Sequence, residues 1–282
     1  MTRRAKTVIK SIFAKTISII LLAIGAIVLV FPFMWAISSS LQGRGMAFTY
    51  PPTFFQPPFI WENYATALLD LDFFNYAKNS FILTGIACVA HPLSSSLAAF
   101  GIAKYDNWGT KFTDGVIVTL LVMPVVASSV PLYVMWMNLG FLDTYVPILF
   151  KYFFGTVFAI YLIRQTFKSL PGDFYDAGLI DGCNPFTIYY KIYLPLAKAI
   201  MATVVLQTFM GEWNDMMQPL IYLTTKSKYN LALGLLYVKG NYTHRQEVLM
   251  ASSVVMMVPS IVIYACLQKF FVQGVAAAGV KG

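Results

Sequence analysis

The feature that most constrains this chain is an uncharged apolar run at residues 16–40, TISIILLAIGAIVLVFPFMWAISSS. A helix needs about 20 mostly apolar residues to cross the hydrocarbon core of a bilayer, and this run exceeds that length. A basic leader precedes the run, but the run is too long for the core of a cleavable signal peptide. We therefore predict an uncleaved N-terminal membrane span.

Composition extends this interpretation to the whole chain. The 282 residues are 58% hydrophobic and only 11% charged. A soluble domain carries about 25% charged residues, so these charges are too few to cover a globule of this size with a solvated surface. The composition indicates an integral membrane protein and excludes disordered, collagen-like, coiled-coil and disulfide-scaffold chains. We expect no nucleic-acid partner despite the formal charge of +8, because Lys and Arg mark the cytoplasmic side of membrane proteins.

Six apolar segments predict an all-α integral membrane protein with six transmembrane helices. They lie at about 16–40, 77–103, 115–138, 147–168, 198–223 and 248–270. Prolines interrupt the second, third and sixth segments, which favours kinked helices packed against neighbours. We treat residues 1–282 as a single transmembrane domain with two long connections, at about 41–76 and 169–197.

The basic residues predict the orientation. With the N-terminus in the cytoplasm, thirteen of the twenty Lys and Arg residues fall inside or at the inner boundary. Basic loops favour the cytoplasmic side, so both termini are predicted to be cytoplasmic. The 169–197 loop then lies inside the cell, and the loop at 41–76, which is rich in proline and aromatic residues, lies outside.

The 169–197 loop carries start and stop signals for two short helices. Asp173 is a plausible N-cap for a helix at about 174–181, and Gly182 stands where a helix-ending residue with positive φ is needed. Asn184 followed by Pro185 begins a second, amphipathic helix that runs to Leu194. From these residues alone, the pair is either a docking element or an ordinary solvated loop.

The same loop resembles a motif of a known family. It reads Asp176-Ala177-Gly178, then two residues, Asp181-Gly182-Cys183 and, further on, Leu194-Pro195. This spacing is similar to the EAA loop of permease subunits of binding-protein-dependent ABC importers. Three positions depart from that motif: Asp replaces Glu, Gly replaces the second Ala, and Cys replaces the third. The shorter Asp reduces the reach of the carboxylate toward a partner arginine.

Other segments resemble the carbohydrate-uptake branch of that family, of the maltose-permease type. The resemblance covers essentially the whole chain. It includes Trp61-Glu62-Asn63-Tyr64, Met123-Pro124, Trp213-Asn214-Asp215 and the tail Ala278-Gly279-Val280-Lys281-Gly282.

The resemblance implies a type I ABC importer permease fold in a bacterial plasma membrane, with the 169–197 loop as a coupling helix docked on an ATPase. It implies four kinds of partner: a second permease, two ATPase subunits that bind Mg-ATP, an external solute-binding protein and a carbohydrate. The residues implied in ATPase coupling are Asp176, Ala177, Gly178, Asp181, Gly182, Gly279 and Lys281. The chain itself is expected to be no enzyme and to hold no cofactor or metal, and it contains no G-x-x-x-x-G-K-[ST] phosphate loop.

A polar cluster interrupts the fifth apolar segment. Charges at membrane depth are costly and usually face a cavity. Sugars are bound by flat aromatic faces together with polar groups, which this cluster offers. The cluster is therefore either a wall of the substrate path or an interhelical polar lock at a helix end. It comprises Gln207, Glu212, Trp213, Asn214, Asp215 and Gln218.

Two functional hypotheses remain at this stage. The first is an ATP-driven importer subunit that passes a sugar, such as an oligosaccharide, by alternating access. The second is an ion-coupled secondary transporter, which needs internal repeats or paired intramembrane charges. Only Glu212 and Asp215 could supply such charges, and no repeat is visible. The sequence does not name the sugar.

Overall fold

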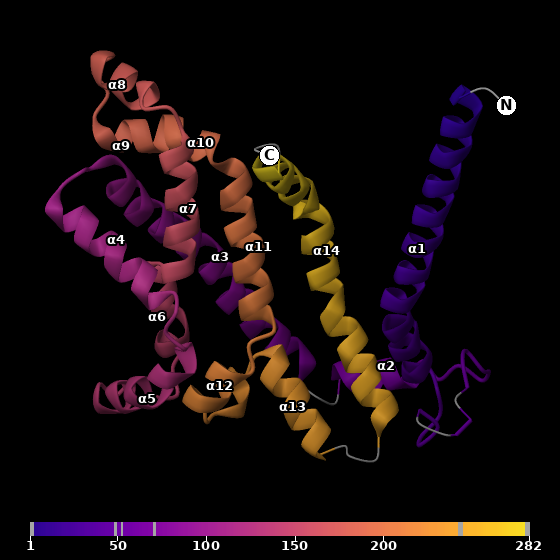
Figure 1. The fold of residues 1–282 in the computed structure, drawn as a ribbon. Coiled ribbons are helices and arrows are strands. Elements are labelled where there is room, and N and C mark those ends of the chain that lie inside the picture. The colour runs from indigo at the N-terminus through magenta and orange to yellow at the C-terminus, as the bar shows by residue number, and fades with distance from the viewer. Residues whose placement is uncertain (1–2, 48–49, 52, 70–71, 242–244, 280–282) are drawn as a thin grey trace. The chain divides into compact units, whose positions relative to one another are not determined.

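The computed structural model describes residues 3–47, 50–51, 53–69, 72–241 and 245–279. Helices are the regular elements of this described part, which contains no strand (Figure 1). The chain divides into two compact units, one of residues 1–71 and 237–256 and one of residues 72–236 and 257–282.

In the first unit, α1 (Arg3–Ser40) is joined to α2 (Glu62–Leu69) by polar contacts. The Tyr64 and Ser40 hydroxyls lie 2.7 Å apart, and the Asn63 amide donates to the carbonyls of Ser40 and Gln42 at 2.9 and 2.8 Å. In the opening turns of α14 (Gln246–Gly279), Val248 and Ala251 pack with Ala67 and Tyr64 of α2. The polar contacts hold α2 against the end of α1.

The second unit is built around α3 (Phe73–Lys104). Helices α4 (Trp108–Leu120), α6 (Val146–Phe154), α7 (Val157–Ser169) and α11 (Lys198–Trp213) pack against α3 or against each other, and we call these five helices the α3 bundle. One end of α7 and α11 carries α8 (Asp173–Ile180), α9 (Pro185–Ile188), the π-helical turn η2 (Tyr189–Tyr193) and α10 (Leu194–Leu196) (Figure 1).

The other end of the second unit carries shorter elements. These are η1 (Val125–Ser128), α5 (Ser129–Asn138), α12 (Met217–Tyr222), η3 (Lys226–Lys228) and α13 (Leu231–Asn241). The Asp143 carboxylate accepts hydrogen bonds from the Thr224 and Thr225 amides at 3.0 and 2.9 Å and from the Lys228 ammonium at 2.7 Å. We call this arrangement the Asp143 knot.

Four helical stretches of the described residues are long and apolar enough to cross a membrane: Lys15–Ser40, Phe73–Lys104, Val146–Ser169 and Gln246–Gln268. They coincide with the predicted first, second, fourth and sixth apolar segments, and their crossing of a membrane stays a prediction. A fifth candidate is the pair Pro185–Leu196 and Lys198–Trp213, which bends by 79° at the break. The number of six spans stays a prediction.

The predicted third segment, 115–138, is divided close to the prolines that interrupt it in the sequence. The segment forms α4, a 3₁₀ turn and α5, and α4 already begins at Trp108, where Asn107 and Thr110 form a capping box. Helix α4 has 13 residues and is about 20 Å long, which is short of the roughly 30 Å hydrocarbon core. Pro124 follows α4, and a proline disfavours helical geometry in the residue before it.

Candidate functional site

Helix α8 occupies the place predicted for the first short helix of the 169–197 loop. It begins one residue earlier than predicted, at Asp173, and the residue in the N-cap position is Gly172 without a side-chain cap. The N-cap assignment of Asp173 was therefore wrong. The carboxylates of Asp173 and Asp176 lie in the first turn, where the positive end of the helix dipole stabilises them.

The end of α8 confirms the predicted glycine elbow. Gly182 has φ of +76°, a value that favours glycine. Its amide donates to the Leu179 carbonyl at 3.0 Å, and the Cys183 amide donates to the Gly178 carbonyl at 2.9 Å. This pair of bonds is a Schellman motif, which satisfies carbonyls at the helix end. The elbow therefore reverses the chain without unpaired backbone groups at these two positions.

The second helix of the loop starts as predicted. The Asn184 side chain accepts a hydrogen bond from the Thr187 amide at 2.8 Å, and Pro185 occupies the first helical position. The helix then continues through α9, η2 and α10 before the bend into α11. The 169–197 loop is thus a pair of helices.

The outward face of α8 combines apolar side chains with carboxylates. Asp176 and Ala177 are exposed, and so are Phe174, Leu179 and above all Ile180, whose exposed fraction is 85%. An apolar surface of this kind, bordered by charged groups, is typical of a protein interaction site. We call these five residues the α8 face.

Gly178 points in the opposite direction. It is buried, and a Cβ atom added there would lie 2.8 Å from Cγ1 of Ile188 on α9. Real Cβ contacts are longer than this, so the absence of a side chain at Gly178 lets α8 and α9 pack closely. The observed contact of this glycine is internal to the loop, and its contact with an ATPase stays a prediction.

The polar residues of the predicted fifth span separate into three groups. Glu212 and Trp213 are buried. The Tyr152 hydroxyl donates to Glu212 Oε2 at 2.9 Å, and the Trp213 ring stacks on Phe209 with the centroids 5.4 Å apart. The Phe81 ring meets the other side of Trp213 edge-on, at 4.9 Å. This pair locks α11 to α6 and α3.

Asn214 and Asp215 stand at a break in the predicted span. The Asn214 amide donates to the Met210 carbonyl at 2.8 Å, and Asp215 Oδ1 accepts from the Gln218 amide at 3.2 Å. The span expected at 198–223 is therefore two helices, α11 and α12, whose ends these polar side chains satisfy. The break lies at the polar residues that interrupt this segment in the sequence, and a single span made of α11 and α12 stays a prediction.

The third group lies on one exposed stripe of α11. Gln207, Met210, Gly211 and Asn214 are exposed and recur at helical spacing. We call these four residues the α11 stripe. The spacing of seven and four in the sequence predicts one helical face for Gln207, Asn214 and Gln218. Gln207 and Asn214 share that face, but Gln218 lies on α12 beyond the break, so this part of the prediction was wrong. Glu212 and Trp213 are buried in the bundle.

Sequence reasoning missed the ion pair inside the bundle. The Arg164 guanidinium on α7 contacts the Asp114 carboxylate on α4, and the side chains are only 6% and 25% exposed. The two residues are far apart in sequence. The sequence held one indication of this pair. A negative charge, Asp114, stands at the start of the third apolar segment, and a positive charge, Arg164, stands near the end of the fourth.

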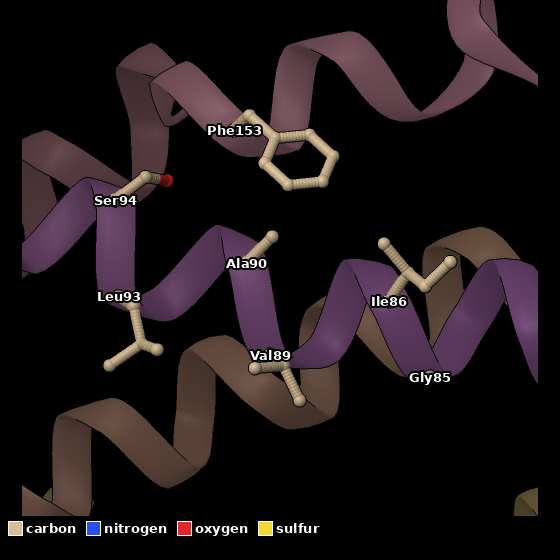
Figure 2. A pocket seen from close by; sticks show the side chains of 7 residues that line it. All are labelled: Gly85, Ile86, Val89, Ala90, Leu93, Ser94 and Phe153. Carbon is tan, nitrogen blue, oxygen red and sulfur yellow. The ribbon is translucent and has the colours of Figure 1, made fainter.

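A groove on α3 offers few hydrogen-bonding groups. It has a volume of about 550 Å³ and lies between α3 and Phe153 of α6, as Figure 2 shows. Its lining is apolar except for Ser94, whose hydroxyl donates to the Tyr152 carbonyl at 2.7 Å. A sugar needs several free hydrogen-bonding groups, which this lining lacks.

Two residues of the predicted coupling set lie at the C-terminus. Gly279 is the last residue of α14, and Lys281 lies outside the described residues.

Residues 92–277 match the family described as binding-protein-dependent transport system inner membrane component. This chain belongs to that family of transport permeases. The diacetylchitobiose uptake system permease protein NgcG of Streptomyces coelicolor is 30% identical over 90% of this chain and 84% of its own. The arabinooligosaccharides transport system permease protein AraQ of Bacillus subtilis is 29% identical over 74% of each chain.

The fold agrees with that membership. A chain in the crystal structure of a bacterial ABC transporter involved in the import of the acidic polysaccharide alginate superposes with a TM-score of 0.80. The match covers 96% of this chain and 99% of that one, at 23% identity. The second unit and α1 are thus parts of a type I ABC importer permease fold.

Proposed function

We propose that this chain is the transmembrane subunit of an ATP-driven importer that passes an oligosaccharide from an external solute-binding protein across the bacterial plasma membrane. The α8 face carries the proposal: an apolar surface with carboxylates, at the spacing of a family motif, needs a partner protein. That partner is one of two ATPase subunits, which hold Mg-ATP. A second permease completes the path, both termini lie in the cytoplasm, and this chain contains no cofactor.

In this proposal the α8 face docks in a cleft of the ATPase. Asp176 pairs with a basic residue there, and Ala177 permits close approach. Asp181 and Gly182 shape the elbow that holds α8 in place. The chain's end, from Gly279 to Lys281, adds a second contact with the ATPases.

The α11 stripe is the proposed wall of the sugar path. Gln207 and Asn214 offer exposed amides on one helix face. The buried Glu212 and Trp213 hold that face in position from behind, and Asp215 and Gln218 set the helix break beside it. In this arrangement Trp213 acts through packing and the amides contact the sugar.

The relatives suggest the substrate class. Their names refer to arabinooligosaccharides, diacetylchitobiose and melibiose, raffinose and stachyose. These are short, uncharged saccharides, so we propose a neutral oligosaccharide for this importer.

The test is ATP hydrolysis by the complex that co-purifies with this chain from its native membrane, reconstituted with its solute-binding protein in liposomes. Arabinotriose, diacetylchitobiose and raffinose are the probes. Stimulation by one of them, abolished by Asp176→Arg, is the expected result. A well-folded chain that brings no ATPase with it, or uptake that follows an ion gradient and survives ATP depletion, would contradict the proposal. A Gln207→Ala/Asn214→Ala variant is expected to lower uptake while the complex stays assembled.

A further inference from the structure

Phe100, a buried residue near the C-terminal end of α3, contacts the 169–197 loop. The Phe100 ring centroid lies 6.2 Å from that of Tyr175 on α8 and 5.2 Å from that of Tyr193 on η2. It also lies 5.3 Å from that of Tyr189. One residue of α3 therefore touches both helices of the loop.

Lys104, one turn further along α3, contacts the same rings. Its ammonium lies 4.4 Å from the centroid of the Tyr193 ring and 5.8 Å from that of Tyr175. A cation at this distance is attracted to the face of an aromatic ring, more strongly where water is excluded. Tyr193 is fully buried and Lys104 is half-buried. The attraction between the ammonium and the ring is therefore stronger than it would be between two exposed side chains.

These contacts join parts that the chain does not join directly. The loop is continuous with α7 and α11, whereas α3 ends more than sixty residues before α8 begins. A displacement of α8 reaches α7 and α11 through the backbone. It reaches α3 only through packed side chains, among which the Lys104–Tyr175–Tyr193 group spans both helices of the loop.

We propose that Lys104 is a positioning residue that makes α3 follow the movement of α8. The proposal rests on the function proposed above, in which an ATPase moves α8. The ammonium holds Tyr175 and Tyr193 together, so the two loop helices and the end of α3 move as one body. Without the Lys104 ammonium, the ATPase still binds α8. Closure of the nucleotide sites then moves α8 but moves α3 less.

The experiment compares Lys104→Met, which keeps the length and loses the charge, with Lys104→Arg, which keeps the cation. The complete complex is assayed in liposomes with the solute-binding protein and the three sugars named above. Lys104→Met is expected to raise the number of ATP molecules hydrolysed per sugar transported by at least about threefold. The amount of ATPase that co-purifies stays the same. Lys191→Met, at an exposed position of the same loop, is the matched control and keeps the wild-type ratio.

A double-mutant cycle identifies the ring that Lys104 acts through. The effects of Lys104→Met and Tyr193→Leu on the ratio are expected to be less than additive, whereas the exposed Tyr190→Leu adds independently. If sugar stimulates ATP hydrolysis in the wild-type complex and Lys104→Met keeps the wild-type number of ATP molecules per sugar, the proposed role of Lys104 is wrong and the proposed function still stands. Absence of stimulation in the wild-type complex would contradict the proposed function instead.

A second measurement does not depend on the sugar or on the ATPase. In the isolated chain in detergent, Lys104→Met is expected to speed hydrogen exchange of the α8 amides, and Lys104→Arg to leave it unchanged. Unchanged protection of α8 in Lys104→Met overturns the proposal even where transport cannot be measured.

Discussion

The 169–197 loop and the α3 bundle differ in the side chains that they bury. The loop presents apolar side chains outward on the α8 face and buries a glycine, Gly178, against Ile188. The bundle buries charged and polar groups, namely Glu212 with Tyr152 and Arg164 with Asp114. Exposed apolar groups gain by finding a partner protein, while buried charges need partners inside the same chain. The loop therefore leaves apolar side chains exposed, whereas the bundle pairs its buried charges within the chain, although Arg164 Nε and Glu212 Oε1 lack a hydrogen-bond partner.

The largest expected effect concerns the buried ion pair. Asp114→Asn leaves the Arg164 guanidinium buried without a counter-charge, and its Nε atom already lacks a hydrogen-bond partner. We expect a loss of stability on the order of 3 kcal/mol, measured by thermal unfolding of the detergent-solubilised chain. The exposed pair of Asp106 and Lys111, 3.0 Å apart, provides the control. If Asp106→Asn lowers the stability as much as Asp114→Asn does, the buried position of the Asp114–Arg164 pair is not the reason for the loss.

The next effect concerns the α8 face. Ile180→Asp places a charge on its most exposed apolar side chain and is expected to lower ATPase affinity about 30-fold or more, as for an interface hot spot. The unfolding temperature of the free chain stays unchanged, because the Ile180 side chain is mostly exposed and packs little against the rest of the chain. Ile180→Leu keeps an apolar group and should retain the ATPase. Unfolding of the free Ile180→Asp chain at lower temperature would instead assign Ile180 to the fold.

A smaller effect is expected from Tyr152→Phe. The ring remains, but Glu212 loses its hydrogen-bond donor while its other oxygen already lacks one. Removing the donor is expected to cost about 1–2 kcal/mol. Thermal unfolding measures it, and Glu212→Leu in the same chain should recover most of the loss by removing the unpaired carboxyl. A double variant less stable than Tyr152→Phe alone would show that Glu212 has another essential partner.

Gly178→Ala distinguishes a packing role from an interface role. The added methyl meets Ile188, and overpacking of this kind costs about 1–3 kcal/mol. Alanine favours a helix over glycine by up to about 1 kcal/mol, which offsets part of the cost. We expect a net loss of about 1 kcal/mol in the isolated chain, less than additive with Ile188→Ala. If the isolated chain is unaffected and only ATPase binding falls, Gly178 belongs to the interface.

The smallest expected effect is a pH dependence outside the bundle, at the Asp143 knot. Burial raises the pKa of Asp143, but hydrogen bonds from Lys228, Thr225 and Thr224 outweigh it and hold the pKa below the ordinary value. The knot is therefore stable at neutral pH and weakens as the pH falls below about 4 toward the lowered pKa. Hydrogen exchange of the Thr224 and Thr225 amides, corrected for intrinsic rates, should accelerate there. Asp143→Asn should remove this pH dependence, and its persistence would exclude Asp143 as the source.

Local signals in the sequence predicted much of the structure. Gly182 and the Asn184-Pro185 pair correctly marked the elbow and the second helix, because each depends on the residue's own conformational preferences. Hydropathy placed four segments where the structure has helices long and apolar enough to cross a membrane. The prolines of the third segment and the polar cluster of the fifth indicated the interruptions between α4 and α5 and between α11 and α12, but not the residues at which each helix ends.

The parts that the sequence could not supply depend on which helices are neighbours. The inward direction of Gly178, the pairing of Arg164 with Asp114 and the contact of Lys104 with Tyr193 all join distant residues. A single sequence carries the charges and the rings but not their adjacency. The polar cluster shows the same limit, since its six residues face three different environments.

The close contact of Gly178 with Ile188 has a consequence for exchanging loops between permeases. An engineer can give a permease the loop of another permease so that it accepts a different ATPase. Transferring the short motif alone would succeed only if the motif packed against no other part of the loop. Here an alanine brought in at the glycine position would meet an isoleucine left behind from the host chain. The portable segment is therefore the whole helix pair, from Asp173 to Leu196, inherited together.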